Sequence, residues 1–260
     1  MIIRESEGLR YFQFESLAAE NVTQAIFTRQ GGISPRPWDS LNLGSTVGDD
    51  LDRVTGNKHK ILQSIGFSES RLAQIHQVHS SRVIKIEEPV VDKSTLIPGD
   101  AMITDITDLL MLMRFADCVP IYIYDPVNHA AALAHAGWKG TVQGVARETV
   151  RALVREYGSN PKDLLAGIGP SIGPDHYQIG DDVIQEVKNA YRDTWSQVLS
   201  YNHDGVKFNL WQANEIALGC AGVENIEIAG ICTACDTGNW FSHRAEKGNT
   251  GRFAAVLALT

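Results

Sequence analysis

The sequence predicts an α/β fold in which helices cover a mixed sheet in a layered α-β-α arrangement. Strand-like apolar runs alternate irregularly with helical stretches along the 260 residues, which favours a layered α/β architecture. Two of the runs are joined by a tight turn, so that pair is antiparallel, and a purely parallel doubly wound sheet is disfavoured. Because no repeat, low-complexity segment or Pro/Ser-rich linker interrupts the chain, residues 1–260 are expected to form one domain.

Eight runs predict buried strands because they are rich in β-branched and apolar residues and end at turn residues. In chain order they are 24–29, 82–87, 109–115, 120–125, 130–136, 164–169, 225–231 and 253–260. The periodicity of apolar residues predicts helices. Three of these span 52–65, 140–157 and 181–199, and 210–222 is a candidate for a fourth.

The composition excludes several classes of protein. The net charge is -8, whereas a protein that contacts many nucleic-acid phosphates is usually basic. No apolar run approaches the roughly 18 residues of a membrane span, and the first residues lack the apolar core of a signal peptide. Without an export signal, the four cysteines favour reduced thiols or a metal site over disulfides. We therefore expect a cytoplasmic protein that binds neither nucleic acid nor membranes.

A predicted hairpin brings a cysteine and a histidine together. Residues 125–128, Asp-Pro-Val-Asn, have the composition of a type I turn. If Tyr124 pairs with His129 across this turn, Cys118 lies directly opposite His135 on one face. The Cβ atoms of such a pair are about 4.5–5.5 Å apart, so a thiolate and an imidazole can share one metal ion. The alternative is that Cys118 is a buried apolar residue and His135 is only hydrogen-bonded.

A third ligand would come from the segment QIHQVHSSRV, in which His76 and His79 are three residues apart. In an extended strand the two side chains point to opposite faces, so at most one of them binds. The spacing does not choose between them. Two histidines and one cysteine with an open fourth position are typical of catalytic rather than structural zinc. Asp117, on the opposite face from Cys118, is interpreted as a structural or supporting residue.

Three glycine-rich segments follow predicted strands and indicate a ligand cleft lined by backbone amides. HAGWKGT contains Lys139 and opens a predicted helix, FTRQGGIS contains Arg29, and the third segment is AGIGPSIGPDHYQIG. Free N–H groups at a helix start favour an anion, and arginine holds phosphate through forked contacts. Arg244 and Arg252 are further candidates for anion contacts. The alternative is that the glycines only permit tight turns and the arginines are solvated.

Cys232 and Cys235 form a CxxC motif. Structural zinc sites with this motif normally use a second pair, and Cys220 is a poor substitute for one. A thioredoxin-like motif would open a helix in a βαβ unit, which the pattern does not predict here. The favoured interpretation is therefore two ordinary reduced thiols.

Eight motifs occur in the order characteristic of one bacterial family: FTRQGGIS, LNLG, QVHSSRV, GDAMITD, ADCVPIYIYD, AHAGWKG, GIGPSIG and FSHRAEKGNTGR. From about Ala25 to the C-terminus the chain resembles the laccase-domain family, also called multicopper polyphenol oxidase-like proteins or peptidoglycan editing factor. The resemblance implies a layered α/β fold similar to that of cytotoxic necrotizing factor-like toxin domains. It also implies a zinc site formed by His79, Cys118 and His135, with copper as the alternative metal.

The family includes purine nucleoside phosphorylases that also deaminate adenosine. The resemblance therefore implies phosphorolysis of adenosine, inosine or methylthioadenosine to free base and ribose 1-phosphate. The implied partners are a purine nucleoside and phosphate, and the implied assembly is a monomer or homodimer. The implied catalytic residues are His79, Cys118, His135 and Asp117, and the implied substrate or phosphate contacts are Arg29, Asn42, Lys139 and Arg244.

Three other functions remain open. A copper-dependent polyphenol oxidase normally needs several copper centres, whereas this chain has eight histidines and no HxH pair. A cysteine hydrolase would use Cys118 as nucleophile and His135 as base without a metal. A role as peptidoglycan editing factor would need no phosphate-dependent turnover. Three positions also depart from the family pattern: His176 stands where cysteine is common, Lys139 where arginine is frequent, and SHRA replaces SYRR.

Overall fold

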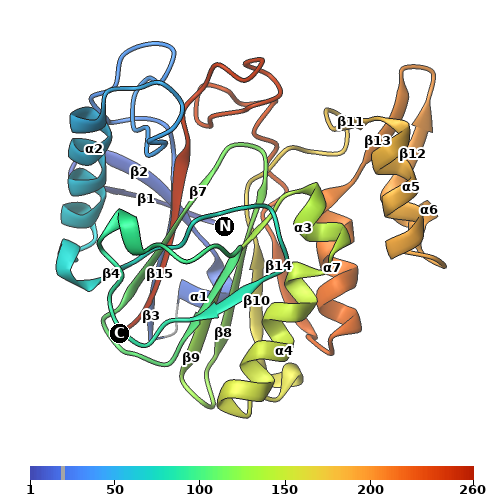
Figure 1. Cartoon of the computed structure of the whole chain (residues 1–260), viewed down its shortest axis with the longest axis horizontal. Helices are drawn as coiled ribbons and strands as arrows, with labels where there is room; N and C mark the ends of the chain where they lie inside the picture. The colour runs from blue at the N-terminus through green and yellow to red at the C-terminus, as the bar shows by residue number, and fades with distance from the viewer. Residues whose placement is uncertain (19–20) are drawn as a thin grey trace.

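The computed structural model describes residues 1–18 and 21–260. Two six-stranded mixed sheets lie face to face, and helices cover the outer face of each (Figure 1). The layered α/β fold with mixed strand directions is therefore confirmed. The strands divide between two sheets, so the layers run α-β-β-α, a division that the strand pattern alone does not predict.

The first sheet is antiparallel except for one short parallel pair at its edge, formed by the last two strands in its order. Its order is β1 (Ile2–Ser6), β2 (Leu9–Gln13), β3 (Val22–Phe27), β15 (Phe253–Leu259), β7 (Leu110–Phe115) and β4 (Leu72–Ala73). The outer face of this sheet packs against α2 (Leu51–Ser64) through a cluster that includes Phe27, Ile61 and Leu62. Asp50 begins α2 because its carboxylate accepts hydrogen bonds from two amides of the first turn.

The second sheet carries the predicted hairpin at its centre, and each edge pair is parallel. Its order is β14 (Asn225–Ile228), β10 (Leu165–Ile168), β8 (Val119–Asp125), β9 (Ala130–Ala136), β6 (Ala101–Thr104) and β5 (Val83–Lys85). Its outer face is covered by the helices α3 (Trp138–Val142), α4 (Val145–Tyr157) and α7 (Leu210–Cys220).

Smaller elements complete the chain. The third sheet pairs β11 (Gln178–Ile179), β13 (Gly205–Phe208) and β12 (Leu199–Asn202), and with α5 (Asp181–Ala190) and α6 (Trp195–Val198) it projects to one side (Figure 1). The remaining elements are α1 (Glu15–Ala18) and three 3-10 turns at Glu69–Arg71, Lys93–Thr95 and Pro161–Asp163. None of the helices in the described part of the chain is both long and apolar enough to cross a bilayer.

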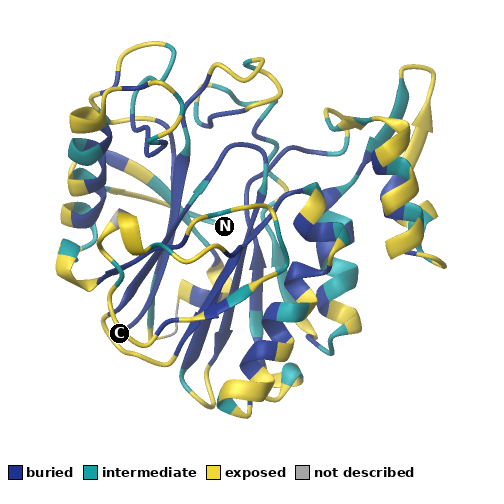
Figure 2. Ribbon diagram, viewed as in Figure 1, coloured by how far each residue is buried: buried dark blue, intermediate teal, exposed yellow. Residues whose placement is uncertain are grey.

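Alternation along the central strands explains why their sequences read as continuous apolar runs. In β8, Ile121 and Ile123 pack toward the helices, whereas Tyr122 and Tyr124 pack between the two sheets. Figure 2 shows the central strands of both sheets as buried ribbons, whereas edge strands such as β1 are partly exposed. A strand that is buried on both faces needs apolar residues at every position, which is the pattern the sequence carries.

The predicted strands are all present, but two of the predicted helices are interrupted. The helix expected over 140–157 is divided into α3 and α4 at Gly144, whose φ of 79° lies in the left-handed region. The helix expected over 181–199 ends at Ala190 and resumes only as the short α6. Periodicity does not distinguish one amphipathic helix from two that bury the same face.

The hairpin of β8 and β9 has a register that differs from the prediction by two residues. The turn occupies 126–129, and Asp125 pairs with Ala130. The Asp125 carboxylate accepts two hydrogen bonds from backbone amides of the turn, at 2.9 and 3.0 Å. The expected pairing of Tyr124 with His129 is therefore wrong, because His129 lies in the turn with a φ of 50°.

Candidate active site

Three side chains converge beyond the ends of β8 and β9. Cys118 directly precedes β8, His135 lies in β9 opposite Pro120, and His79 lies in the loop between β4 and β5. A register shift of two residues keeps side chains on the same face, so Cys118 and His135 are diagonal neighbours. The Cys118 sulfur and one nitrogen from each of His79 and His135 lie within 4.8 Å of one another. Of the two histidines left open by spacing, the geometry brings His79 rather than His76 into this cluster.

Asp100 holds the two histidines of the cluster in place. The carboxylate is fully buried at the start of β6. Its Oδ1 accepts a hydrogen bond from the His79 backbone amide at 3.0 Å and lies 2.9 Å from His135 Nδ1. Its Oδ2 accepts from the amide and hydroxyl of Ser80 at 2.6 and 2.8 Å. These bonds secure a loop in which His79 has an unusual positive φ of 60°.

The Asp100 contact also decides which nitrogen of His135 is free. Burial would raise the pKa of Asp100, but hydrogen bonds from His135 and Ser80 outweigh burial and lower it to about 2. The ionised carboxylate only accepts hydrogen bonds, so His135 Nδ1 carries a proton. The other ring nitrogen, Nε2, is left to face Cys118, and a carboxylate behind a histidine is the usual support of a metal ligand.

The protonation states of Cys118 and His135 depend on each other. Burial would raise the pKa of Cys118, but the charge of His135 and hydrogen bonds from both histidines outweigh it and lower the pKa to about 6. Burial would lower the pKa of His135, but Cys118 and Asp100 outweigh it and raise the pKa to about 9. The cluster therefore favours the thiolate, which is the form that binds metals and attacks electrophiles.

Asp117 lines the cleft next to Cys118 and is held by hydrogen bonds from two other segments, while its expected catalytic role stays a prediction. Its Oδ1 accepts a hydrogen bond from Thr233 Oγ1 and its Oδ2 accepts from the Arg244 amide, both at 2.7 Å. With both oxygens engaged and only 8% of the residue exposed, Asp117 ties the C-terminal loops to Cys118. Its φ of 80° is a strained conformation of the kind that clusters at functional sites.

The cluster opens into a cleft of about 820 Å³ that is lined by residues from several separate loops, the C-terminal ones included. Arg114, Lys139, Arg244 and Arg252 line this cleft together with His76 and His243. Asp117 is the one acidic residue among the described residues that line it. In a chain with a net charge of -8, this concentration of cations favours an anionic ligand.

Lys139 and Arg244 are placed at the cleft as the sequence analysis expected. Lys139 is exposed in the first turn of α3, with its ammonium 5.5 Å from the centre of the Trp138 ring. The Arg244 guanidinium lies 5.0 Å from the centre of the Tyr177 ring and donates to the Gln178 carbonyl at 2.8 Å. Both side chains are therefore near the metal-binding cluster.

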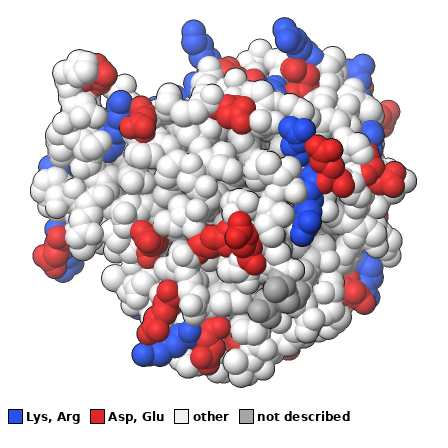
Figure 3. Space-filling view, turned by 180° about the vertical axis from the view of Figure 1, so that it is seen from behind, with Lys and Arg blue, Asp and Glu red and all other residues white. Residues whose placement is uncertain are grey.

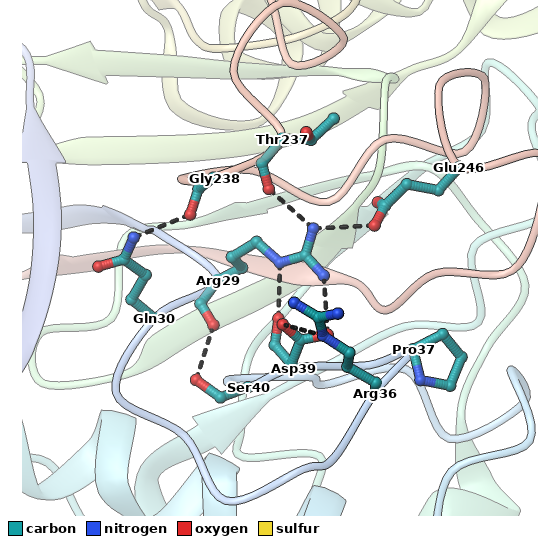
Figure 4. A pocket seen from close by; sticks show the side chains of 9 residues that line it. All are labelled: Arg29, Gln30, Arg36, Pro37, Asp39, Ser40, Thr237, Gly238 and Glu246. Carbon is teal, nitrogen blue, oxygen red and sulfur yellow. Dashed lines mark hydrogen bonds and ion pairs between the residues drawn. The ribbon is translucent and has the colours of Figure 1, made fainter.

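Arg29 is not among the described residues that line this cleft, so the structure does not bring this predicted phosphate contact to the cluster. Figure 4 shows its guanidinium between two loops, with its donors already used. It donates to the carbonyls of Asp39 at 2.6 Å and Thr237 at 2.8 Å, and to the Glu246 carboxylate at 2.9 Å. It also lies 4.3 Å from the centre of the Phe241 ring. Arg29 therefore joins loops rather than binding substrate in the cleft.

Asn42 is not among the described residues that line the cleft, but it is bonded to two residues that do. The side chain is fully buried. Its Oδ1 accepts hydrogen bonds from the amides of Gly44 and Arg252, both at 2.8 Å. Gly44 and Arg252 line the cleft, so Asn42 positions residues that can contact a ligand.

Sequence reasoning missed Asp100 and Arg114. Asp100 lies in the quoted motif GDAMITD, and an acidic residue at the start of a buried strand was the available signal. Arg114 lies in an apolar strand run, where a single arginine is costly unless it serves a site. Its place in the lining of the cleft depends on the pairing of distant strands, which the local pattern does not contain.

The comparisons with known proteins show the family of this chain. Residues 23–260 match the family described as multi-copper polyphenol oxidoreductase laccase. The chain is 34% identical to a Geobacillus stearothermophilus protein named purine nucleoside phosphorylase YlmD, covering 89% of this chain and 88% of that protein. It is 33% identical to the Escherichia coli protein named purine nucleoside phosphorylase YfiH, covering 92% and 95%.

A solved structure is also similar over nearly the whole chain. The crystal structure of Bacillus licheniformis YfiH has a TM-score of 0.92 and 32% identity, covering 99% of both chains. The mixed α/β fold is thus shared with that protein. By its sequence match and its fold, the chain belongs to the multi-copper polyphenol oxidoreductase laccase family.

Proposed function

We propose that this protein is a zinc-dependent purine nucleoside phosphorylase with adenosine deaminase activity in the same cleft. The observation that carries the proposal is that one thiolate and two imidazoles share a single cavity with four cationic side chains. These four side chains, called the cation wall below, are Arg114, Lys139, Arg244 and Arg252. The names of the relatives support the reaction class. The cation wall supports an anionic co-substrate, for which phosphate is the simplest candidate.

The donor set at Cys118, His79 and His135 fits zinc. All three are ligand types that zinc accepts, and Asp100 supports His135 from behind. A Cβ on Gly137 would lie 2.9 Å from the Cys118 sulfur, so glycine at this position leaves room beside the sulfur for an ion. Bound zinc would supply a Lewis acid with one coordination position open to water or substrate.

The cations of the cleft would hold phosphate. The Arg114 backbone is hydrogen-bonded to the Gln77 side chain, but its guanidinium has no hydrogen-bond or ionic partner among the described residues, and burial lowers its pKa. A bound anion stabilises a guanidinium in this state, because charge-assisted hydrogen bonds to the anion replace the hydration that burial removes. Arg252 is also mostly buried, with its Nη1 bonded only to backbone carbonyls. Lys139 and Arg244 line the same cleft.

In phosphorolysis, a phosphate oxygen forms a bond to ribose C1′ while the bond from C1′ to the purine nitrogen breaks. The electron pair stays with the departing base, and the proton of dihydrogen phosphate ends on that base. The protein's contribution is to hold phosphate and nucleoside in reactive contact. Trp138, Ile172 and Tyr177 provide an apolar part of the cleft against which the purine ring can lie. In deamination, water replaces the amino group at C6 and ammonia leaves.

One assay tests the proposal. The zinc-loaded protein is incubated with adenosine, inosine or methylthioadenosine, with and without phosphate, and free base, ribose 1-phosphate and inosine are measured. Free base that appears only with phosphate supports phosphorolysis, and inosine from adenosine without phosphate supports deamination. Absence of both products, together with oxygen consumption on a phenol after copper loading, would identify a phenol oxidase instead.

A second candidate function is that of a cysteine hydrolase. It is favoured because Asp100 is hydrogen-bonded to His135, which in turn lies beside Cys118. A carboxylate that orients a histidine beside a thiolate is the arrangement of a nucleophilic triad. Metal dependence separates the two candidates. Zinc removal abolishes turnover in the proposed phosphorylase, whereas a hydrolase keeps or gains activity, because zinc would block its nucleophile.

A further inference from the structure

A second cluster of metal-ligating side chains lies where two loops meet beside the cleft. His176, Cys232 and Cys235 each offer one donor atom, and these three atoms lie within 4.8 Å of one another. His176 Nδ1 is 3.8 Å from the Cys232 sulfur and 3.5 Å from the Cys235 sulfur. Both cysteines are free thiols. The sequence interpretation of two ordinary reduced thiols omits this histidine, which is 56 residues from Cys232.

The spacing of the donors matches a tetrahedral ion. With Zn–S about 2.3 Å and Zn–N about 2.0–2.1 Å, a sulfur and a nitrogen on one tetrahedral zinc are about 3.6 Å apart. The two observed sulfur–nitrogen distances, 3.5 and 3.8 Å, lie on either side of this value. An ion can therefore bind without a large movement of the three side chains. Two thiolates and one imidazole form a soft donor set that selects Zn²⁺ over Mg²⁺ or Ca²⁺.

The fold assembles this cluster from two separate segments. Ser171 and Cys232 form a bridge between the segment that follows β10 and the segment that follows β14. The Gly173 amide donates a hydrogen bond to the Cys232 sulfur at 3.1 Å, and such a bond stabilises a thiolate. His176 and Cys235 are exposed, so an ion can reach the donors from solvent.

We propose that His176, Cys232 and Cys235 form a second metal site, which binds one Zn²⁺ ion with water as its fourth ligand. The ion clamps together two segments that shape the wall of the cleft. One segment carries Ile172 and Tyr177, which line the cleft. The other carries Thr233, whose hydroxyl donates to Asp117. The site acts on structure and does not depend on the proposed phosphorolysis.

Metal counting on the full-length protein tests the site. The wild-type chain and single variants are loaded with Zn²⁺, freed of excess metal, and analysed for zinc per chain. Wild type is expected to hold about two equivalents, while Cys118→Ala and Cys235→Ser each lose one equivalent and Cys220→Ser keeps both. Cys220 is the matched control because it is an exposed thiol on α7 outside both clusters. If Cys118→Ala does not fold, Cys118→Ser serves in its place.

Cobalt loading identifies the ligands of the remaining ion. Cys118→Ala loaded with Co²⁺ is expected to show thiolate-to-cobalt absorption about twice as strong per ion as Cys235→Ser, because the second site has two thiolates and the first has one. The loss of the second ion is also expected to lower the melting temperature of Cys235→Ser more than that of Cys220→Ser. The proposal is overturned if Cys118→Ala retains no zinc, if Cys235→Ser retains as much as wild type, or if mass spectrometry finds a Cys232–Cys235 disulfide in metal-loaded protein.

Discussion

Gly137 lies beside the cluster of His79, Cys118 and His135, at a position where a side chain does not fit. A Cβ at this position would lie 2.9 Å from the Cys118 sulfur and 3.0 Å from His79 Cδ2. Its φ of -72° is ordinary for any residue, so the requirement for glycine comes from the neighbouring ligands rather than from the backbone.

Gly137→Ala is therefore expected to weaken zinc binding without preventing folding. The added methyl group pushes apart two of the three ligands, and we expect the dissociation constant for Zn²⁺ to rise at least about tenfold, as it does when ligand orientation is lost. Competition with a chromogenic chelator measures this constant. Gly219→Ala is the control, because a Cβ there meets nothing within 4 Å and alanine favours the helix by about 0.5–1 kcal/mol. Equal zinc affinity in both variants would contradict the proposed geometry of the cluster.

Asp100 is the residue on which the orientation of the ligands depends most. Asp100→Asn keeps the shape but cannot hold His135 through a charged acceptor, and its amide group can turn a donor toward the histidine. We expect zinc affinity to fall about 10–100-fold, with a comparable loss of nucleoside turnover at limiting zinc. The same chelator competition measures the change, and Asp105→Asn, an exposed residue after β6, is the control. Unchanged affinity in Asp100→Asn would show that the carboxylate does not support the ligand set.

At the scale of elements, the hairpin shows how much of the site a local pattern can predict. The Asp-Pro-Val-Asn sequence correctly located the turn, and alternation correctly placed Cys118 and His135 on one face. The turn has the expected four residues but begins one residue later than predicted, so the actual register is two residues from the predicted one. The two side chains remain on one face despite this error, because side chains alternate between faces with a period of two residues along a strand. A shift of one residue would have separated the two side chains.

The division of strands between two sheets was less predictable for a physical reason. The central strands are buried on both faces, so their apolar runs do not say which sheet they join. β15 lies between β3 and β7, and its pairs include Ala255 with Ile26 and with Met113. Such pairings join residues far apart in the chain. The positions of Asp100, Arg114 and His176 at the two clusters depend on these long-range pairings, so local motifs could not assign them.

The two sheets are joined at one edge by Glu227. This residue of β14 accepts hydrogen bonds at Oε2 from the Ser16 amide and hydroxyl, at 2.9 and 2.8 Å, where α1 begins after the first sheet's β2. Burial would raise the pKa of Glu227, but the bonds from Ser16 and neighbouring groups outweigh it and lower the pKa. A carboxyl whose pKa is lowered on folding stabilises the folded state above its unfolded pKa, about 4.3. That contribution is lost as the pH falls below this value.

Glu227→Gln is expected to lower the free energy of unfolding at pH 7 by about 1–3 kcal/mol, because it removes charge-assisted hydrogen bonds. The difference in the free energy of unfolding between Glu227→Gln and wild type is expected to become smaller as the pH falls below about 4. Urea unfolding at a series of pH values measures both effects. Glu224→Gln, an exposed partner of Lys162, should change stability by less than about 0.5 kcal/mol. A Glu227→Gln effect that stayed constant down to pH 2 would contradict the account of this edge.

For the whole molecule, charge is distributed unevenly between the cleft and the outer surface. Acidic and basic groups are interspersed on the face shown in Figure 3, whereas four cations and one carboxylate line the cleft. An anion is thus attracted to the cleft despite the net charge of -8. Salt weakens such attraction, because the Debye length falls from about 10 Å at 0.1 M to about 3 Å at 1 M.

We expect the KM for phosphate to rise with ionic strength, and to rise about 10–100-fold in Arg114→Gln, which loses a charge-assisted contact. Since the guanidinium has no ionic partner among the described residues, its removal should not lower stability. Steady-state kinetics and thermal unfolding measure the two effects. Arg151→Gln is the control, because Arg151 is exposed on α4 and paired with Glu148. A phosphate KM that does not change in Arg114→Gln would remove this residue from the phosphate site.

The central claim is that the metal cluster and the cation wall act together on a purine nucleoside and phosphate. The most direct measurement is the amount of ribose 1-phosphate formed from adenosine, inosine or methylthioadenosine by the zinc-loaded chain, compared with Cys118→Ala under the same conditions. We predict phosphate-dependent ribose 1-phosphate with the wild-type chain and none above background with the variant. Equal amounts from both proteins, or none from zinc-loaded wild type with any of the three nucleosides, would contradict the claim.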